Sequence, residues 1–390
     1  MSDGRVPHRR HWVGVTIALL VTAILIALGW IAVRGLGAIN DLNRVSDDSA
    51  SYDRAIANAD LEKLEPIEAR LTQHSKSARS LTSDPVWRAF EIVPWLGADL
   101  AALREVAEIT DDLAAKVVQP LSQAAAELDL STLGFDKNPL DFAAFESAQA
   151  PLDTAATLFS DAAAKADRIS TSAAIPAFSD AVQEMQTRLR KNAAHVGALH
   201  NASLLLPTML GREAPRLYLV TVQNDSTTAS VALVGAQSGT VTALRTISAA
   251  DLPDAAMVLT APDASADVAA LWQQHFGEVI DGVITLDLGA AAHLLEATGE
   301  LTVTDFTIDS SNVEMALSSP AYLELADEVQ LQQVFTASTA LLVEYALAAE
   351  PNEVIEALAQ SGDEGRIAVW SAHEEEQKLL DGSSLVSSKK

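Results

Sequence analysis

The stretch RLYLVTVQ, residues 216–223, is rich in β-branched and long apolar side chains and predicts a β-strand. Further short runs of this kind follow, each bounded by Gly, Asp or Ser: Val231–Val234, Thr240–Ile247, Ala256–Thr260, Val283–Leu286, Leu301–Ile308 and Arg366–Trp370. Helical patterns lie between or after them: Ala264–Phe276, Gly289–Thr298, Glu328–Ala349, Asn352–Ser361 and Glu374–Leu380. Strands interleaved with helices predict a mixed α/β (α+β) distal domain over residues 206–381, followed by a flexible tail at residues 382–390.

Residues 35–205, which precede that strand, carry helical patterns. Apolar side chains from Leu100 to Leu121 recur every three or four residues, and Pro120 is placed to kink or divide this helix. A second series is spaced like a coiled-coil seam: Phe178, Val182, Met185, Leu189, Asn192, Val196 and Leu199. We expect an all-α bundle or stalk in which these stripes pack against one another, and a partner helix is the alternative.

The apolar run WVGVTIALLVTAILIALGWIAV, from Trp12 to Val33, contains 22 residues and no charge. As a helix it is roughly 33 Å long, enough to cross a hydrocarbon core of about 30 Å. Trp12 and Trp30 lie near its ends, where indole rings prefer the headgroup level. The sequence therefore predicts a transmembrane anchor in the lipid bilayer over residues 12–34. A buried core helix and a cleaved signal peptide are the alternatives.

The charges on either side of this run predict its orientation. Arg5, Arg9 and Arg10 precede it, whereas Arg34 and Arg44 behind it are diluted by acidic residues. An excess of Arg on the short N-terminal side places residues 1–11 in the cytoplasm. We expect a single-pass protein of the cell membrane whose remaining chain is extracytoplasmic.

The composition excludes several classes of function. The formal charge of −27 argues against sequence-independent binding of nucleic acid, which requires Lys and Arg against the phosphates. The absence of Cys excludes thiol catalysis, Cys-ligated zinc and disulfides. An exported protein without Cys fits a bacterial cell envelope better than a eukaryotic secretory route.

Four blocks of sequence resemble a known family. They are LTSDPVWRAFEIVPWLGADL (residues 81–100), LLPTMLGREAPRLYLVTVQND (205–225), VIDGVITLDLGAAAHLLEATGEL (279–301) and RIAVWSAHEEEQKLL (366–380). Their order and spacing are similar to those of the domain-of-unknown-function 4012 family of bacterial membrane-anchored envelope proteins. The resemblance covers roughly residues 75–380.

The chain also departs from that family. In relatives the strand that ends in Gln-Asn-Asn leads to an Arg and a Thr-Gly-Gly loop, whereas here Gln223, Asn224 and Asp225 are followed by STTASVALVGAQSG. Relatives also continue into further strands beyond the position of Lys390. We therefore expect a divergent or shortened member, in which the ligand-binding role of the Gly-rich loop is open.

No catalytic motif is recognisable in the sequence. Gly235-Ala236-Gln237-Ser238-Gly239 has the wrong spacing for a nucleophile elbow and predicts a hairpin turn instead. His373-Glu374-Glu375-Glu376-Gln377 lacks the second His of a zinc helix and is interpreted as a solvated helix start. We assign no metal ligands, no cofactor and no catalytic residue, and whether the chain is an enzyme stays open.

Six residues are candidates for ligand binding. Between Thr246 and Gly365 the sequence has no Lys or Arg but 21 acidic residues, so the only cations near the first strands are Arg212, Arg216 and Arg245. A phosphate-bearing ligand would need them to converge, and the alternative is that they are surface or strand-edge charges. The remaining candidates are polar residues at strand ends: Asn224, Asp281 and Asp287. Asp281 is also expected in a turn with Gly282, and Asp287 as the cap of the next helix.

Two functions are consistent with these features. The first is a non-catalytic binding or scaffold protein in cell-surface or polysaccharide assembly, with an envelope protein or glycan as partner. The second is a transferase that acts on polyprenyl-phosphate-linked glycan, by analogy with the LytR-CpsA-Psr class. The second requires the three arginines to line one apolar pocket. The identity of the partner and the oligomeric state stay open.

Overall fold

The structure is a computed structural model that describes residues 9–57, 60–94, 96–128, 139–170, 176–224, 229–252 and 264–381. It divides into two compact units. The helical unit comprises Met1–Ala126 and Ala150–Gly197, and the α/β unit comprises Glu127–Gln149 and Ala198–Lys390. The N-terminal eight residues, the predicted strand Ala256–Thr260 and the predicted tail 382–390 lie outside the described residues.

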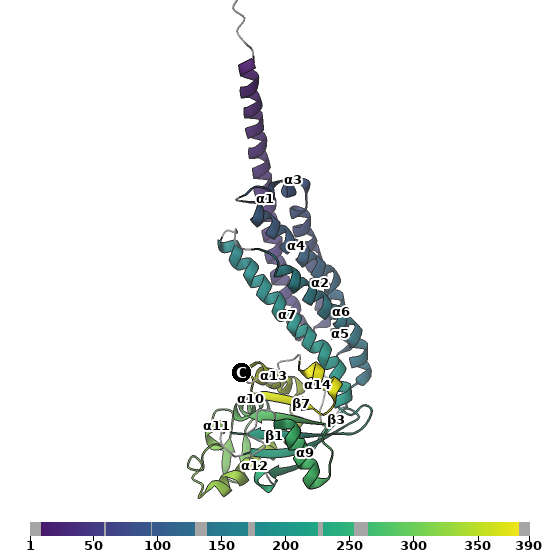
Figure 1. Ribbon diagram of the computed structural model, residues 1–390, viewed down its shortest axis with the longest axis vertical. Coiled ribbons are helices and arrows are strands. Elements are labelled where there is room, and N and C mark those ends of the chain that lie inside the picture. Colours follow the sequence, from purple (N-terminus) through teal and green to yellow (C-terminus); the bar gives the residue numbers. More distant parts are fainter. Residues whose placement is uncertain are drawn as a thin grey trace, which may run out of the picture. The chain divides into compact units, whose positions relative to one another are not determined.

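Seven α-helices are described before the first strand (Figure 1). They are α1 (Arg9–Ala57), α2 (Leu64–Thr82), α3 (Pro85–Phe90), α4 (Gly97–Lys116), α5 (Val118–Glu127), α6 (Phe142–Ala166) and α7 (Pro176–Met209), with a 3₁₀ turn, η1 (Leu61–Lys63), ahead of α2. Within the described ranges α1 is the one helix long and apolar enough to cross a membrane, with a qualifying span at Leu25–Ile56.

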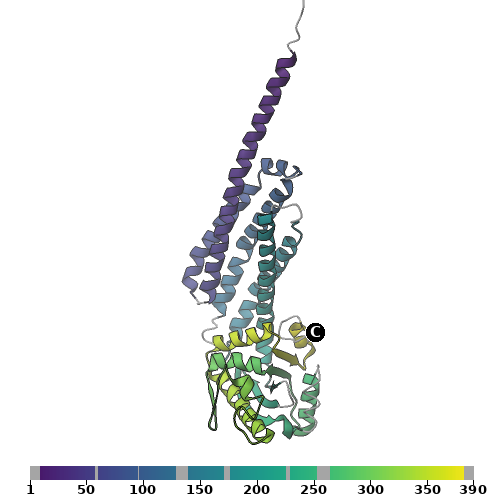
Figure 2. The ribbon, with the colours of Figure 1, turned by 90° about the vertical axis from the view of Figure 1, so that its left-hand side faces the viewer.

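The packing of α1 changes along its length. Ile31, Ala38, Val45 and Tyr52 are buried and recur every seven residues, so they form one stripe against the neighbouring helices. Before Ile31, the large apolar side chains of Leu25, Ile26 and Trp30 are instead exposed, and Leu28 is half-buried. Figures 1 and 2 both show the N-terminal part of α1 extending beyond the rest of the helical unit.

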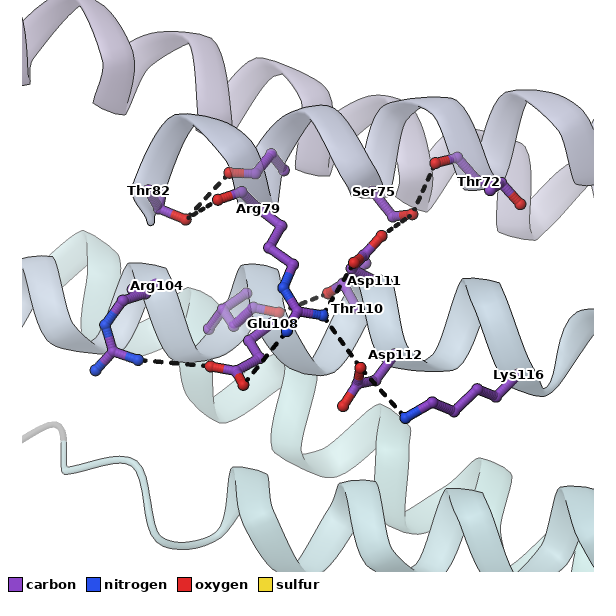
Figure 3. Close-up of polar contacts among 12 residues, drawn as sticks. Thr72, Ser75, Arg79, Thr82, Arg104, Glu108, Thr110, Asp111, Asp112 and Lys116 are labelled. Atoms are coloured by element: carbon purple, nitrogen blue, oxygen red, sulfur yellow. Dashed lines mark hydrogen bonds and ion pairs between the residues drawn. The ribbon is translucent and has the colours of Figure 1, made fainter. Parts of the chain in front are cut away.

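A polar cluster joins α2 to α4 on one side of the helical unit (Figure 3). Arg79 of α2 lies 3.0 Å from Asp111 and 3.2 Å from Asp112 of α4, and it also pairs with Glu108. Asp111 accepts a hydrogen bond from Ser75. The hydrogen bond to Asp111 raises the pKa of Arg79. These contacts link α2 to α4.

The predicted stripes account for most of the helical packing. Val117 ends α4 and α5 begins at Val118, so Pro120 lies in a first turn, where a backbone N–H has no partner within the helix. Of the α7 seam, Val182, Leu189 and Val196 are buried. Asn192 is exposed, and Ala193 packs against the neighbouring helices instead. The prediction that Asn192 belongs to the seam is therefore wrong.

The α/β unit contains a five-stranded sheet in the order β3-β2-β1-β4-β7. The strands are β1 (Arg216–Gln223), β2 (Ala229–Gln237), β3 (Thr240–Ser248), β4 (Gly282–Asp287) and β7 (Ile367–Ser371). β1 and β4 run parallel, and the other pairs are antiparallel. Leu219 pairs with Val283 in the β1–β4 register. The sheet therefore contains both parallel and antiparallel pairs, and it agrees with the predicted α/β domain after the helices.

Helices cover both faces of this sheet. One face packs on α9 (Ala264–Phe276), through Leu219, Val231 and Trp272. The other face packs on α10 (Leu288–Thr298), α12 (Glu328–Ala348) and α13 (Pro351–Asp363), through Val222, Leu286 and Phe335. The remaining short elements are η3 (Ala249–Asp251), β5 (Leu301–Val303), β6 (Phe306–Ile308), α11 (Val313–Ala316) and α14 (Glu374–Leu380).

Two turns bear on the sequence predictions. Ser238 and Gly239 both have positive φ and connect β2 to β3, which confirms the hairpin turn at this position. Leu301–Ile308 is not one strand, because Thr304 also has a positive φ and turns the chain into the β5–β6 hairpin. The alternating sequence LTVTDFTI has the period of a strand on both sides of the turn, which hides the reversal.

Candidate functional site

One group of ionisable side chains in the α/β unit surrounds Arg216. Its Nη1 lies 2.8 Å from Asp281 Oδ1, and its Nη2 donates to Glu376 Oε1 at 3.3 Å. His373 contacts Arg216 and places its Nε2 2.8 Å from the same Asp281 oxygen. These four residues form what we call the Arg216 cluster.

Strand ends bring the Arg216 cluster together. Arg216 begins β1, Asp281 directly precedes the parallel strand β4, and His373 follows β7. Asp281 also accepts the backbone N–H of Leu217 at 2.9 Å, so its carboxylate links two neighbouring strands. Glu376 is buried in α14 and accepts a hydrogen bond from Ser371 at 2.7 Å.

The contacts within the Arg216 cluster favour the charged forms of both Asp281 and Arg216. Burial alone would raise the pKa of Asp281, but the hydrogen bonds from Leu217, His373 and Arg216 outweigh it and lower the pKa below its usual value. Burial likewise opposes the charge on Arg216, yet its acidic partners raise the pKa of the guanidinium. The Arg216 cluster is thus an ion-pair network in which Arg216 is already matched by two carboxylates, Asp281 and Glu376.

Arg245 occupies a different environment in β3. Its Nη2 lies 2.6 Å from Glu278 Oε2, which also accepts the indole N–H of Trp272. The guanidinium stacks over Phe276, 4.5 Å from the ring centroid, and over Trp272. Arg245 therefore links β3 to the C-terminal end of α9, through cation–π contacts with Trp272 and Phe276 and an ion pair with Glu278, which follows the helix.

The predicted arginines do not converge. Arg216 shares the strand parity of Val220 and Val222, which face α10, α12 and α13, whereas Arg245 contacts α9 on the opposite face of the sheet. Arg212, in the turn before β1, pairs with Glu146 of α6. Each arginine is matched by its own acid, so they do not line one pocket.

Asn224 and Asp287 lie at the other end of the parallel strands. Gln223 and Asp287 are partners in the β1–β4 register, and Asn224 directly follows. Asp287 Oδ1 accepts the N–H of Ala290 at 2.8 Å and caps α10, which confirms the capping role. Asn224 is buried and donates to the carbonyl of Leu317 at 3.1 Å.

A second chain of charges begins at this capping residue. Arg366 Nη1 lies 3.4 Å from Asp287 Oδ2, and its Nε lies 2.6 Å from Glu364. Glu364 also lies 3.1 Å from His293 Nε2. The hydrogen bond from His293, followed by those from Gln360 and Arg366, lowers the pKa of Glu364 to about 2. Asp281 and Asp287 therefore belong to two different networks at opposite ends of β4.

Comparison with protein families gives one match. Residues 223–322 match the family described as "Protein of unknown function (DUF4012)". This match supports membership of that family over about a quarter of the chain, residues 223–322. No curated protein and no solved structure matches the chain.

The DUF4012 match divides the candidate residues. It contains Asn224, Arg245, Asp281 and Asp287. It ends before β7 and α14, so it does not include the C-terminal residues of either charge network. The matched segment supplies the acids at both ends of β4, Asp281 and Asp287. The basic partners Arg216 and Arg366 come from outside that segment.

Sequence reasoning missed several members of these networks. His373 and Glu376 were assigned to a solvated helix start, and Glu374 and Glu375 are indeed exposed, but Glu376 is buried against Arg216. Arg366 and Glu278 were not singled out. One signal was present: RIAVWSAHEEE places an Arg before a strand and a His and Glu after it, and strand ends are where such networks form in this sheet.

Proposed function

We propose that this DUF4012 member is a single-pass protein of the bacterial cell envelope whose C-terminal unit lies outside the cytoplasm and binds a partner without catalysis. The observation that carries the anchor is the change in α1 at Ile31. From Ile31 onward a buried stripe packs on protein, and residues 34–57 carry seven charged side chains. The uncharged run 12–33 is the part of α1 suited to a bilayer.

The side chains at the end of this run support the same assignment. Leu25, Ile26, Trp30 and Val33 are exposed, with Val33 at 72%. An exposed apolar surface of this kind on a helix is unfavourable in water and favourable in lipid. The excess of Arg before residue 12 supports a cytoplasmic N-terminus.

The binding role rests on the pairing of the arginines. A transferase acting on polyprenyl-phosphate-linked glycan would present cations to phosphate. Here Arg216 and Arg245 face opposite sides of the sheet, and each is neutralised by a carboxylate. Residues 35–390 carry 22 basic and 52 acidic side chains, a net of −30. Such a surface favours basic or cation-bridged partners, with an association that weakens as salt rises.

Native mass spectrometry of the full chain, extracted gently from its own membranes, tests the binding role. We expect a stoichiometric protein or glycan partner that is basic or bridged by cations and is released at raised ionic strength. A bound polyprenyl-linked glycan would contradict the proposal and favour the transferase. The variants Arg216→Gln and Arg245→Gln would then show whether either arginine holds that ligand.

A further inference from the structure

A short apolar segment lies beside the exit of the proposed anchor. Residues 85–94, PVWRAFEIVP, form α3 and the turn that leads to α4. Figures 1 and 2 show α3 at the end of the helical unit from which the N-terminal part of α1 extends. This segment therefore lies where α1 stops being covered by protein.

Arg34 fixes the segment to the last residue of the anchor. Its guanidinium donates to the carbonyls of Leu81 at 2.9 Å and Ser80 at 2.6 Å, so it caps the C-terminus of α2. It also lies 2.9 Å from Asp84, whose carboxylate accepts the N–H of Trp87 and caps α3. One side chain at the end of the apolar run thus sets the position of α3.

Trp87 makes the packing contact between the segment and α1. It is 1% exposed and lies in one cluster with Ile31 and Ala38 of α1. A Cβ atom at Gly35 would lie 3.5 Å from its ring, so the two helices approach closely at this point. Ile31 is three residues before Arg34, about 4.5 Å along the helix axis. If the run 12–33 spans the bilayer, Trp87 is level with the headgroups, a layer about 5–7 Å deep on each side.

The outer surface of the segment suits lipid rather than water. Ile92 is 85% exposed, and Val86 is also exposed. The two acids of the segment region are both paired: Asp84 with Arg34, and Glu91 with Arg104 at 2.7 Å. The exposed charge among residues 85–94 is Arg88, a cation in an otherwise strongly acidic chain. Apolar side chains with a cation and without free acids are typical of an interfacial membrane contact.

We infer that residues 85–94 form a second membrane contact, in which Ile92 and Val86 enter the headgroup layer and Arg88 meets anionic lipid phosphates. This inference rests on the proposed anchor, because the anchor supplies the level of the bilayer. The contact would fix the helical unit to the membrane at two points. It would thereby limit rotation of the unit about α1, which a single helix cannot do.

The test measures membrane depth at single cysteines in the full chain, which has no Cys of its own. Nitroxide labels at Ile92→Cys, Leu25→Cys and Val329→Cys are compared in vesicles of phosphatidylethanolamine and phosphatidylglycerol. Leu25 lies in the proposed anchor, and Val329 is an exposed residue of α12 in the α/β unit. Because oxygen partitions into lipid and a nickel chelate stays in water, their relative collision rates with each label report its depth.

We expect the oxygen-to-nickel ratio at position 92 to be several-fold higher than at 329 and lower than at 25. A ratio at 92 equal to that at 329, with a high ratio at 25, would overturn the second contact and leave the anchor intact. An immobile label at 92, shielded from both reagents, would show that protein covers the segment and would overturn it too. An aqueous ratio at 25 would contradict the anchor itself, and the inference with it.

Discussion

Arg216, the first residue of β1, lies 2.8 Å from Asp281, and the parallel strands β1 and β4 run side by side from this pair. Both side chains are largely shielded from water. Asp281 in addition accepts the N–H of Leu217, so the pair joins the strands through both side chain and backbone. The Arg216 cluster therefore stabilises the pairing of β1 with β4.

Replacing Asp281 by Asn should destabilise the sheet. The change leaves Arg216 without its nearest acid and weakens the hydrogen bond to Leu217, at a cost on the order of 2 kcal/mol. Hydrogen exchange of the β1 and β4 amides in the full chain measures this loss. Asp305→Asn is the matched control, because Asp305 is exposed in the β5–β6 turn. Equal exchange in the two variants would contradict a structural role for the pair.

The Asp281 contribution should depend on pH. Because the pKa of Asp281 is lower in the folded chain than in the unfolded chain, its carboxylate stabilises the fold above the unfolded value of about 4. This stabilisation is lost as the pH falls through the lower, folded pKa. The difference in unfolding free energy between the wild type and Asp281→Asn should shrink as the pH falls below about 4. A difference that grows as the pH falls from about 4 would disprove this assignment.

Asp287 should act as a helix cap that Ser can replace. Asp287→Ala removes the acceptor for Ala290 and should cost about 1 kcal/mol of stability. Asp287→Ser keeps a capping oxygen but loses the contact with Arg366, so it should recover most of that loss. Urea unfolding of the two variants distinguishes the roles. If Ser is as unfavourable as Ala, the ion pair rather than the cap is what matters.

The β2–β3 turn should not tolerate a side chain at Gly239. This glycine has a φ of +84°, and an added Cβ would lie 2.6 Å from the backbone nitrogen of Leu140. Gly277 also has a positive φ, of +75°, but open space around the added atom. Gly277→Ala should cost about 1 kcal/mol from backbone strain alone. Gly239→Ala should cost clearly more in thermal unfolding, and equal costs would show that residues 139–141 do not pack on this turn.

Local patterns predicted most of the elements. The bounds of β1, α9 and α14 agree with the sequence prediction, and the Asp287 cap followed from a strand that ends directly before a helical pattern. These features depend on residues within one turn or strand of one another. The Leu301–Ile308 hairpin was missed because both halves keep the alternation of a single strand.

The charge networks could not be predicted in the same way. Arg216 and His373 are 157 residues apart, and they meet only because β4 pairs with both β1 and β7. The sequence identified Arg216, Arg245 and Asp281 as polar residues near strands but gave no strand order. Without that order, the pattern did not decide between convergence of the arginines and their separation on two faces of the sheet.

Membrane topology is the central claim, and cysteine labelling in intact spheroplasts tests it most directly. Ser2→Cys and Val329→Cys place single thiols before the anchor and on the α/β unit, where Val329 is 65% exposed. A membrane-impermeant maleimide should label position 329 without lysis and position 2 only after lysis. Labelling of position 2 in intact spheroplasts, or protection of 329 until lysis, would contradict the account.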